Sequence, residues 1–437
     1  MQLDILKEMK LRLLLAPALA AAFILLIAAC SANANFLTDV SVHPTVLTPR
    51  ADGAFDMARI TYKLSQPAQV SIYLTDANGT RYTLRNDAQR SASPAPYELL
   101  FNGVSNGRLL PNGSYTWHVD ATDNSRRQAF SGLLQISSGG VPYPKIKELT
   151  LSTHTISPNR DAIDDHTYIN VVLAQTSTLS VYVVGADGIH YEVQRMEGLR
   201  QTTNGGVLGP GRYTYDYDGG INLGADPPPN GNYTLVARSQ DAIGQQDTLT
   251  STLTITQSGR PVAEIVTQPD GSSVEWSAHG KSVVRAPNEP NFITMGLGDT
   301  LYFTMAVRNV GPVPIRTGGP FNPNDCYTMD ENRYTKGFIQ EPGVFRVGID
   351  YDTNPGPDHP WRWGVGTLKD LDIVMHNGTK LYYLAPGKQV IVSGCIKMTK
   401  IPARNPFSVY ASLIQEDVEI QPVNFHVSPV LIQLVAP

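Results

Sequence analysis

The stretch Pro111-Asn112-Gly113-Ser114-Tyr115-Thr116 recurs 118 positions later as Pro229-Asn230-Gly231-Asn232-Tyr233-Thr234. Upstream of it, a second set of residues repeats at a constant offset of 109 positions. The matched pairs include Pro49 and Pro158, Asp52 and Asp161, Asp56 and Asp165, Ile60 and Ile169, Leu64 and Leu173, Tyr73 and Tyr182, and Gly79 and Gly188. Because self-similarity at a fixed offset marks copies of one structural unit, the chain contains two copies of a module, and the second is longer by nine residues.

Each copy has the pattern of short β-strands separated by tight turns. Ile60, Tyr62 and Leu64 alternate with polar neighbours, as a half-buried strand requires. Asn78-Gly79 and Asp187-Gly188 tolerate the positive φ of a two-residue hairpin. Short strands and turns in units of roughly 100 residues predict an all-β chain of tandem immunoglobulin-like β-sandwiches.

These residues resemble the immunoglobulin-like domain of flagellar hook-capping proteins, which also occurs in other exported bacterial proteins. The family's opening motif, Ser-Pro-Asn-Gly-Asp-Gly, has a counterpart in Ser157-Pro158-Asn159-Arg160-Asp161-Ala162, with Arg160 and Ala162 where glycines are usual. Its Trp-Asp-Gly appears as Phe101-Asn102-Gly103 and Tyr217-Asp218-Gly219. The resemblance implies two sandwiches, which we expect at residues 37–139 and 146–257.

From Val262 onward the pattern changes, and residues 262–437 form a separate unit. The segment 299–311 alternates strongly and ends in a turn. It resembles the first strand pair of cell-adhesion-related domains found in bacteria, and Leu384-Ala385-Pro386-Gly387 resembles their later hairpin. Clusters of Pro, Asn and Asp in residues 320–372 read as long loops. We therefore predict a third β-sandwich with long loops.

Residues 1–29 have the pattern of a bacterial lipoprotein signal peptide. Basic residues precede the apolar run 13–29, which ends at Cys30. Ile27-Ala28-Ala29-Cys30 looks like a lipobox, in which the cysteine is acylated and becomes the first residue, followed by a short linker at residues 30–36. The alternative is a retained membrane helix, although the run is slightly short for one. Translation could start at Met1 or at Met9.

An acylated Cys30 predicts an exported protein that is anchored by lipid to the outer face of the cytoplasmic membrane or to the outer membrane. Cys326 and Cys395 are then the two remaining cysteines, and a disulfide is the natural assignment in an exported chain. Chain entropy suggests about 4 kcal/mol of stabilisation for a loop of this length. The alternative is a catalytic thiol.

Two loops carry enough oxygen ligands to suggest Ca²⁺, although neither has the spacing of an EF-hand. The ordinary alternative for both is a solvated turn. The candidate ligands are Asn159, Asp161, Asp164 and Asp165 in the first loop, and Asp350, Asp352, Asn354 and Asp358 in the second.

Trp361, Arg362 and Trp363 follow the second loop. Exposed aromatic rings with an arginine are typical of protein interfaces and of sugar-stacking surfaces. Strand alternation places the two tryptophans on one face, so they could equally belong to the core. They are the candidate contact site for a protein or a glycan.

The sequence favours a non-catalytic envelope protein, in which two sandwiches act as a spacer and residues 262–437 bind a protein or a glycan of the envelope. An accessory carbohydrate-binding protein is the second hypothesis, and a hydrolase without a recognisable motif is the third. A net charge of −5 and the lack of long basic runs argue against nucleic acid as a partner.

Overall fold

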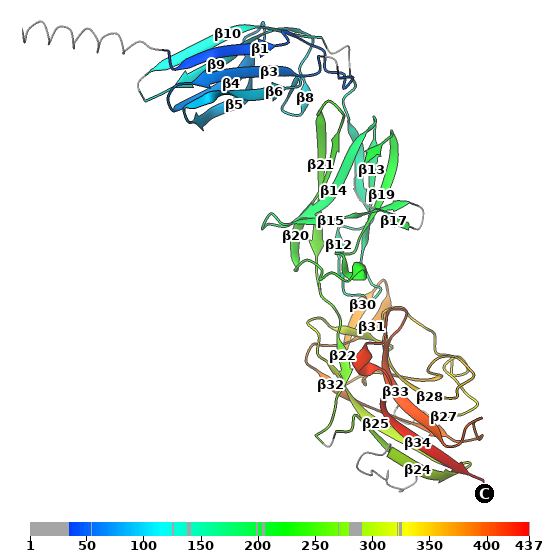
Figure 1. Cartoon of the computed structure of the whole chain (residues 1–437). Helices are drawn as coiled ribbons and strands as arrows, with labels where there is room; N and C mark the ends of the chain where they lie inside the picture. The colour runs from blue at the N-terminus through cyan, green and yellow to red at the C-terminus, as the bar shows by residue number, and fades with distance from the viewer. Residues whose placement is uncertain are drawn as a thin grey trace, which may run out of the picture.

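The computed structural model describes residues 35–53, 55–124, 126–137, 141–197, 200–202, 206–269, 271–278, 291–320, 322 and 326–436. Over these residues the chain is all-β, and three β-sandwiches follow one another in an extended, bent arrangement (Figure 1). No helix of the described chain is long and apolar enough to cross a membrane. The predicted signal peptide and Cys30 lie outside these residues.

The first sandwich pairs a sheet of order β1-β3-β6 with a sheet of order β2-β10-β9-β4-β5, and β7 and β8 form a small hairpin. Alternation along β3 buries Ala58, Ile60, Tyr62 and Leu64, as the sequence pattern predicts. The strands are β1 (Leu37–His43), β2 (Val46–Leu47), β3 (Ala58–Leu64), β4 (Ala68–Thr75), β5 (Arg81–Arg90), β6 (Ser93–Phe101), β7 (Val104–Ser105), β8 (Arg108–Leu109), β9 (Gly113–Thr122) and β10 (Arg127–Ile136).

The second sandwich repeats this topology, with sheets of order β11-β13-β19-β16-β17 and β12-β21-β20-β14-β15, while β18 pairs with β14. The added β16–β17 hairpin lies where the second copy is longer. Its elements are β11 (Ile146–Leu151), β12 (Thr155–Ile156), β13 (Thr167–Leu173), β14 (Ser177–Val184), β15 (His190–Glu192), β16 (Gln194–Glu197), β17 (Arg200–Thr202), β18 (Val207–Leu208), β19 (Gly211–Tyr217), the 3-10 helix η1 (Ile221–Leu223), β20 (Gly231–Gln240) and β21 (Gln246–Ile255).

The repeated Pro-Asn-Gly-x-Tyr stretch has the same structure in both copies. The hydroxyl of Tyr115 donates a 2.8 Å hydrogen bond to the carbonyl of Pro111, and that of Tyr233 donates a 2.6 Å bond to the carbonyl of Pro229. Both rings are buried. A tyrosine that bonds to backbone a few residues upstream is a hallmark of immunoglobulin-type sandwiches. The repeat therefore encodes a specific corner of the fold.

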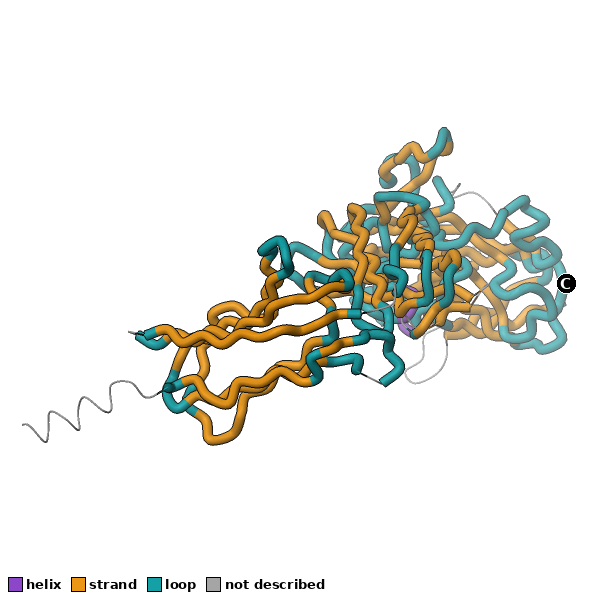
Figure 2. The backbone as a smooth tube through the Cα atoms, turned by 90° about the horizontal axis from the view of Figure 1, so that it is seen from above, coloured by secondary structure: helices purple, strands orange, loops and turns teal. Residues whose placement is uncertain are grey.

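The third sandwich is larger and packs the sheet β22-β25-β32-β27, with β23 beside β25, against the sheet β24-β34-β33-β28-β26-β31-β30, with β29 beside β28. Figure 2 shows that strands dominate the described chain. Its elements are β22 (Ala263–Ile265), β23 (Val274–Ala278), β24 (Asn291–Gly296), β25 (Thr300–Asn309), β26 (Ile315–Thr317), β27 (Cys326–Thr328), β28 (Phe345–Tyr351), β29 (Trp361–Gly364), β30 (Asp372–His376), β31 (Thr379–Leu384), β32 (Gln389–Lys397), β33 (Phe407–Gln415), the 3-10 helix η2 (Pro422–Asn424) and β34 (Val427–Val435).

Cys326 and Cys395 form a disulfide, as predicted, with their Cα atoms 4.5 Å apart. They are direct partners in the parallel pairing of β27 with β32. The disulfide therefore fastens the short strand β27 to the edge of its sheet.

Three separate hydrophobic clusters form the cores of the three sandwiches. Phe36, which the sequence assigns to the linker, is 1 % exposed and belongs to the first core. The backbone N–H groups of Phe36 and Leu37 both donate to Oε1 of Gln128, so β1 is anchored at its first residue.

The joint between the first and second sandwiches is hydrogen bonded. Nδ2 of Asn102 donates to the carbonyl of Ile243 at 2.7 Å, and the backbone N–H of Gln246 donates to the carbonyl of Gly107 at 2.8 Å. A Cβ atom on Gly107 would lie 3.2 Å from the carbonyl oxygen of Gln246, so the two modules approach closely at this glycine. These direct contacts fix the angle between the two modules.

Candidate binding pocket in the third sandwich

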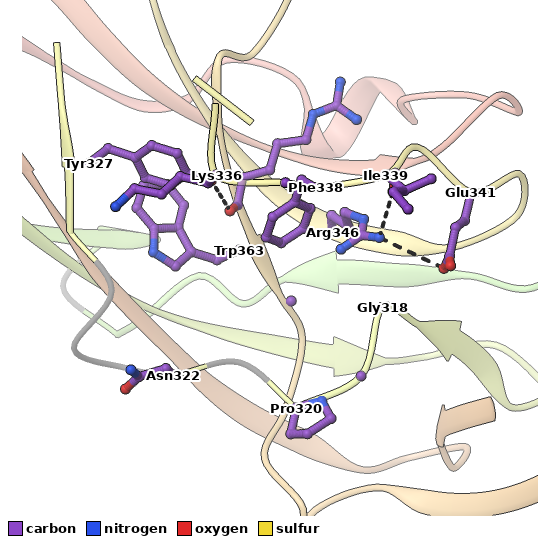
Figure 3. A pocket seen from close by; sticks show the side chains of 14 residues that line it. Gly318, Pro320, Asn322, Tyr327, Lys336, Phe338, Ile339, Glu341, Arg346 and Trp363 are labelled. Carbon is purple, nitrogen blue, oxygen red and sulfur yellow. Dashed lines mark hydrogen bonds and ion pairs between the residues drawn. The ribbon is translucent and has the colours of Figure 1, made fainter. Parts of the chain in front are cut away.

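A cavity of about 570 Å³ opens in the third sandwich, beside the long loops that the sequence predicted. Figure 3 shows side chains from several segments facing a common space. The volume lies within the range of about 300–1,000 Å³ that small-molecule sites occupy. The lining residues used below are Gly318, Tyr327, Lys336, Phe338, Glu341, Arg346, Arg362 and Trp363.

The predicted contact residues Trp361, Arg362 and Trp363 lie on β29, and all three are buried. The tryptophans are 1 % and 2 % exposed, and both belong to the third core. The ring of Trp363 meets that of Phe303 edge-on, with centroids 4.7 Å apart. The prediction of an exposed aromatic surface is therefore wrong, and the alternative of core packing is correct. The burial of the two tryptophans removes the observation that favoured sugar stacking on these rings.

Arg362 points away from the tryptophans into a buried ion-pair network. Its Nη1 lies 2.6 Å from Oε1 of Glu416, and Nε of Arg346 lies 3.1 Å from Oε2 of the same carboxylate. All three side chains are at least 94 % buried. Burial and the nearby Arg333 lower the pKa of Arg362. One buried carboxylate thus serves two arginines that line the pocket.

The loop between β27 and β28 supplies a further part of the pocket lining, including Lys336, Phe338 and Glu341. The guanidinium carbon of Arg346 lies 4.3 Å from the centre of the Phe338 ring, and Nζ of Lys336 lies 5.6 Å from the centre of the Tyr327 ring. The lining contains three cationic side chains and one carboxylate, that of Glu341. Cations against aromatic faces make the lining suited to anions that carry an apolar body.

The first predicted calcium loop is a hydrogen-bonded turn at the joint with the third sandwich. Oδ1 and Oδ2 of Asp165 accept the N–H groups of Asn159 and Ala162. Asp56, the equivalent residue in the first copy, accepts the N–H groups of its own loop in the same way. The side chain of Asp164 lies apart, with Oδ2 3.8 Å from Nδ1 of His376.

Asp161 connects this loop to the third sandwich. It is 4 % exposed, Oδ1 accepts the N–H of Ile163, and Oδ2 accepts the hydroxyl of Tyr383 at 2.8 Å. Nη1 of Arg316 donates to the carbonyl of Asp161 at 3.0 Å. Burial, aided by the charge of Asp165, raises the pKa of Asp161 to about 6. Asp161 therefore acts in the contact between two modules, while Asp165 organises the loop that carries it.

The second predicted calcium loop is also divided by the fold. Asp350 is buried, and its oxygens accept hydrogen bonds from Asn354 and from the backbone of Tyr351 and His359. Asp352 instead accepts the N–H of Ser408. The structure therefore keeps Asn354 and Asp358 close to Asp350 but directs Asp352 elsewhere.

Asp350, Asp358 and His359 do lie close enough to share an ion, with one possible ligand atom of each within 4.8 Å of the others. His359 was not among the predicted ligands, because nothing in the spacing separates it from an ordinary loop residue. Arg333 and Arg362 donate hydrogen bonds to the carbonyl of His359. Two guanidinium groups therefore already supply positive charge beside this cluster, which opposes the entry of a cation.

Comparisons with known proteins give no family assignment. No family model and no curated protein matches the chain. A solved tetra-tandem repeat from the extending region of a large adhesion protein is 14 % identical, with 91 % of this chain and 73 % of that chain covered and a TM-score of 0.19. Alpha-2-macroglobulin of E. coli is 12 % identical, with a TM-score of 0.23, and this chain spans 23 % of its length. A chimeric titin tandem is 16 % identical, with 46 % and 91 % covered and a TM-score of 0.20. These scores carry no argument about function.

Proposed function

We propose that the protein is a non-catalytic envelope lipoprotein, in which the first two sandwiches hold the third away from an acylated Cys30 for binding. The observation that carries the proposal is the serial arrangement of three separate cores, with the pocket in the module farthest from the N-terminal end of the described chain (Figure 1). The direct hydrogen bonds at both joints support it, because a spacer keeps the third sandwich far from the anchor only if its joints resist bending.

The lipid anchor is tested by Cys30→Ser, with Cys326→Ser as the matched control. Cys30→Ser should abolish incorporation of labelled palmitate and release the chain from membranes, whereas Cys326→Ser should leave both unchanged. Display is tested by adding protease to intact cells. If the cells have an outer membrane, the test is repeated on a second preparation in which that membrane is permeabilised. A labelled chain that no protease reaches in either preparation would contradict presentation outside the cytoplasm.

A further inference from the structure

We propose that the pocket of the third sandwich binds a ligand that carries a carboxylate group, and that Arg346 supplies the charge that recognises it. The inference rests on the proposed function for the exposure of the pocket outside the cytoplasm, and it deepens that function by naming the chemistry of the ligand. It is argued from the surroundings of one guanidinium group.

Arg346 is only 5 % exposed, yet its guanidinium group is incompletely paired. Nη2 donates to the carbonyl of Ile339 at 3.2 Å, while the buried Nε lies 3.1 Å from Oε2 of Glu416 and makes no hydrogen bond with the described residues. Nη1 makes no hydrogen bond with any residue that the structure describes. A Cβ atom on Gly318 would overlap Nη1, which places this nitrogen against the glycine wall of the pocket. Nη1 therefore stays open to the cavity that Arg346 lines, and an anion there would supply a hydrogen-bond partner of opposite charge.

The protein's own carboxylates leave part of the positive charge of the pocket without a close partner. Glu416 is shared between Arg346 and Arg362, so it neutralises only part of their combined charge. Oε2 of Glu341 lies 3.8 Å from Nη2 of Arg346 and 3.9 Å from Nη2 of Arg316. Both distances exceed those of a hydrogen bond. Glu341 is 44 % exposed and therefore competes weakly with an incoming carboxylate.

The same wall favours a ligand whose carboxylate is attached to an apolar or planar body. Phe338 and Tyr327 flank the cationic groups of Arg346 and Lys336 in Figure 3. An arginine recognises a carboxylate with directional, charge-assisted hydrogen bonds, and the aromatic faces take up the rest of the molecule. A sugar acid and a small acyl amino acid both have this chemistry.

Isothermal titration of the full chain, purified in mild detergent, tests the proposal with two matched pairs of probes. Hippurate and its uncharged amide differ only in the carboxylate, and glucuronate and glucuronamide differ in the same way for a sugar. In at least one pair, the charged member should bind about tenfold more tightly or better than its neutral partner, the gain expected from a hydrogen bond to a charged group. The pair that discriminates identifies the kind of ligand body.

Variants of small residues test the role of Arg346 without removing a buried charge. Gly318→Ala should displace Nη1 and weaken binding of the charged probe about tenfold. Gly209→Ala is the control, because a Cβ there meets nothing within 4 Å. Glu341→Gln removes the competing carboxylate and should strengthen binding.

Equal affinity for both members of each pair would overturn the proposal. So would the absence of saturable binding up to about 10 mM probe, or full binding in Gly318→Ala. Correct display on cells with no carboxylate binding would refute this inference alone. Binding in detergent by a chain that cells retain in the cytoplasm would instead refute the proposed function.

Discussion

The hydroxyl of Tyr383 on β31 donates a 2.8 Å hydrogen bond to Oδ2 of Asp161, 222 residues earlier in the chain. The two residues belong to different sandwiches, so this bond lies within the joint between the second and third modules. Tyr383 is 7 % exposed and Asp161 is 4 % exposed, and water is therefore largely excluded from the pair.

Tyr383→Phe should loosen this joint by about 1–3 kcal/mol, because it leaves a buried carboxylate oxygen without its donor. Small-angle scattering should show a wider spread of angles between the modules, and protease should cut near residue 260 more rapidly. Tyr382→Phe is the control, because that ring packs against the third core. Equal effects of the two variants would contradict the role of the bond.

The joint should also tighten as pH falls. In the closed joint the pKa of Asp161 is about 6, and we expect opening of the joint to lower it toward the ordinary 3.8, because burial against the third sandwich is lost. Protonation therefore favours the closed form, and this contribution is complete below about pH 4 and lost as pH rises through about 6. The whole shift corresponds to about 3 kcal/mol, which is an upper bound for the joint because Asp165, in the same loop as Asp161, contributes part of it. Scattering from pH 4 to 8 should detect it.

Asp161→Asn should flatten this pH dependence, because asparagine does not ionise. Asp39→Asn, which alters an exposed carboxylate in the first sandwich, should leave it unchanged. Loosening of the joint at low pH in the unaltered chain would show that another group controls it.

Gly343→Ala should separate the second and third modules. A Cβ atom at Gly343 would lie 2.6 Å from the carbonyl oxygen of Arg160, which is backbone and yields little. Gly337→Ala is a matched control, since its φ of +73° resembles the +81° of Gly343 but nothing lies within 4 Å of its Cβ position. Both variants carry the same conformational strain, so a joint that opens only in Gly343→Ala identifies the steric contact. Equal opening would assign the effect to strain.

Trp361→Ala should destabilise the third sandwich rather than weaken a surface contact. Truncating a buried tryptophan costs about 3–5 kcal/mol, which is a large part of a domain's stability. Thermal unfolding followed by tryptophan fluorescence should show a lower midpoint for this module. Leu368→Ala, at a side chain 60 % exposed, should change the midpoint little. A stable Trp361→Ala module would contradict the burial of this ring.

The repeat made the first two sandwiches predictable, because turns such as Asn78-Gly79 and the corner at Tyr115 are local in sequence. The same local pattern could place Trp361 and Trp363 on one face of a strand but could not tell whether that face was covered. Burial of Arg362 depends on Glu416, 54 residues away, and the joint depends on a pair 222 residues apart. Such pairings leave no spacing signal, so the pocket and the joint required the structure.

The disulfide adjoins a wall of the pocket, since Tyr327 follows Cys326 directly on β27. Oxidative folding is therefore part of building the cavity. A chain produced in a reducing compartment should contain two well-folded repeats and a third module in which β27 is no longer held by the disulfide. Under the function proposed above, export would let this disulfide form and so complete the wall of the pocket.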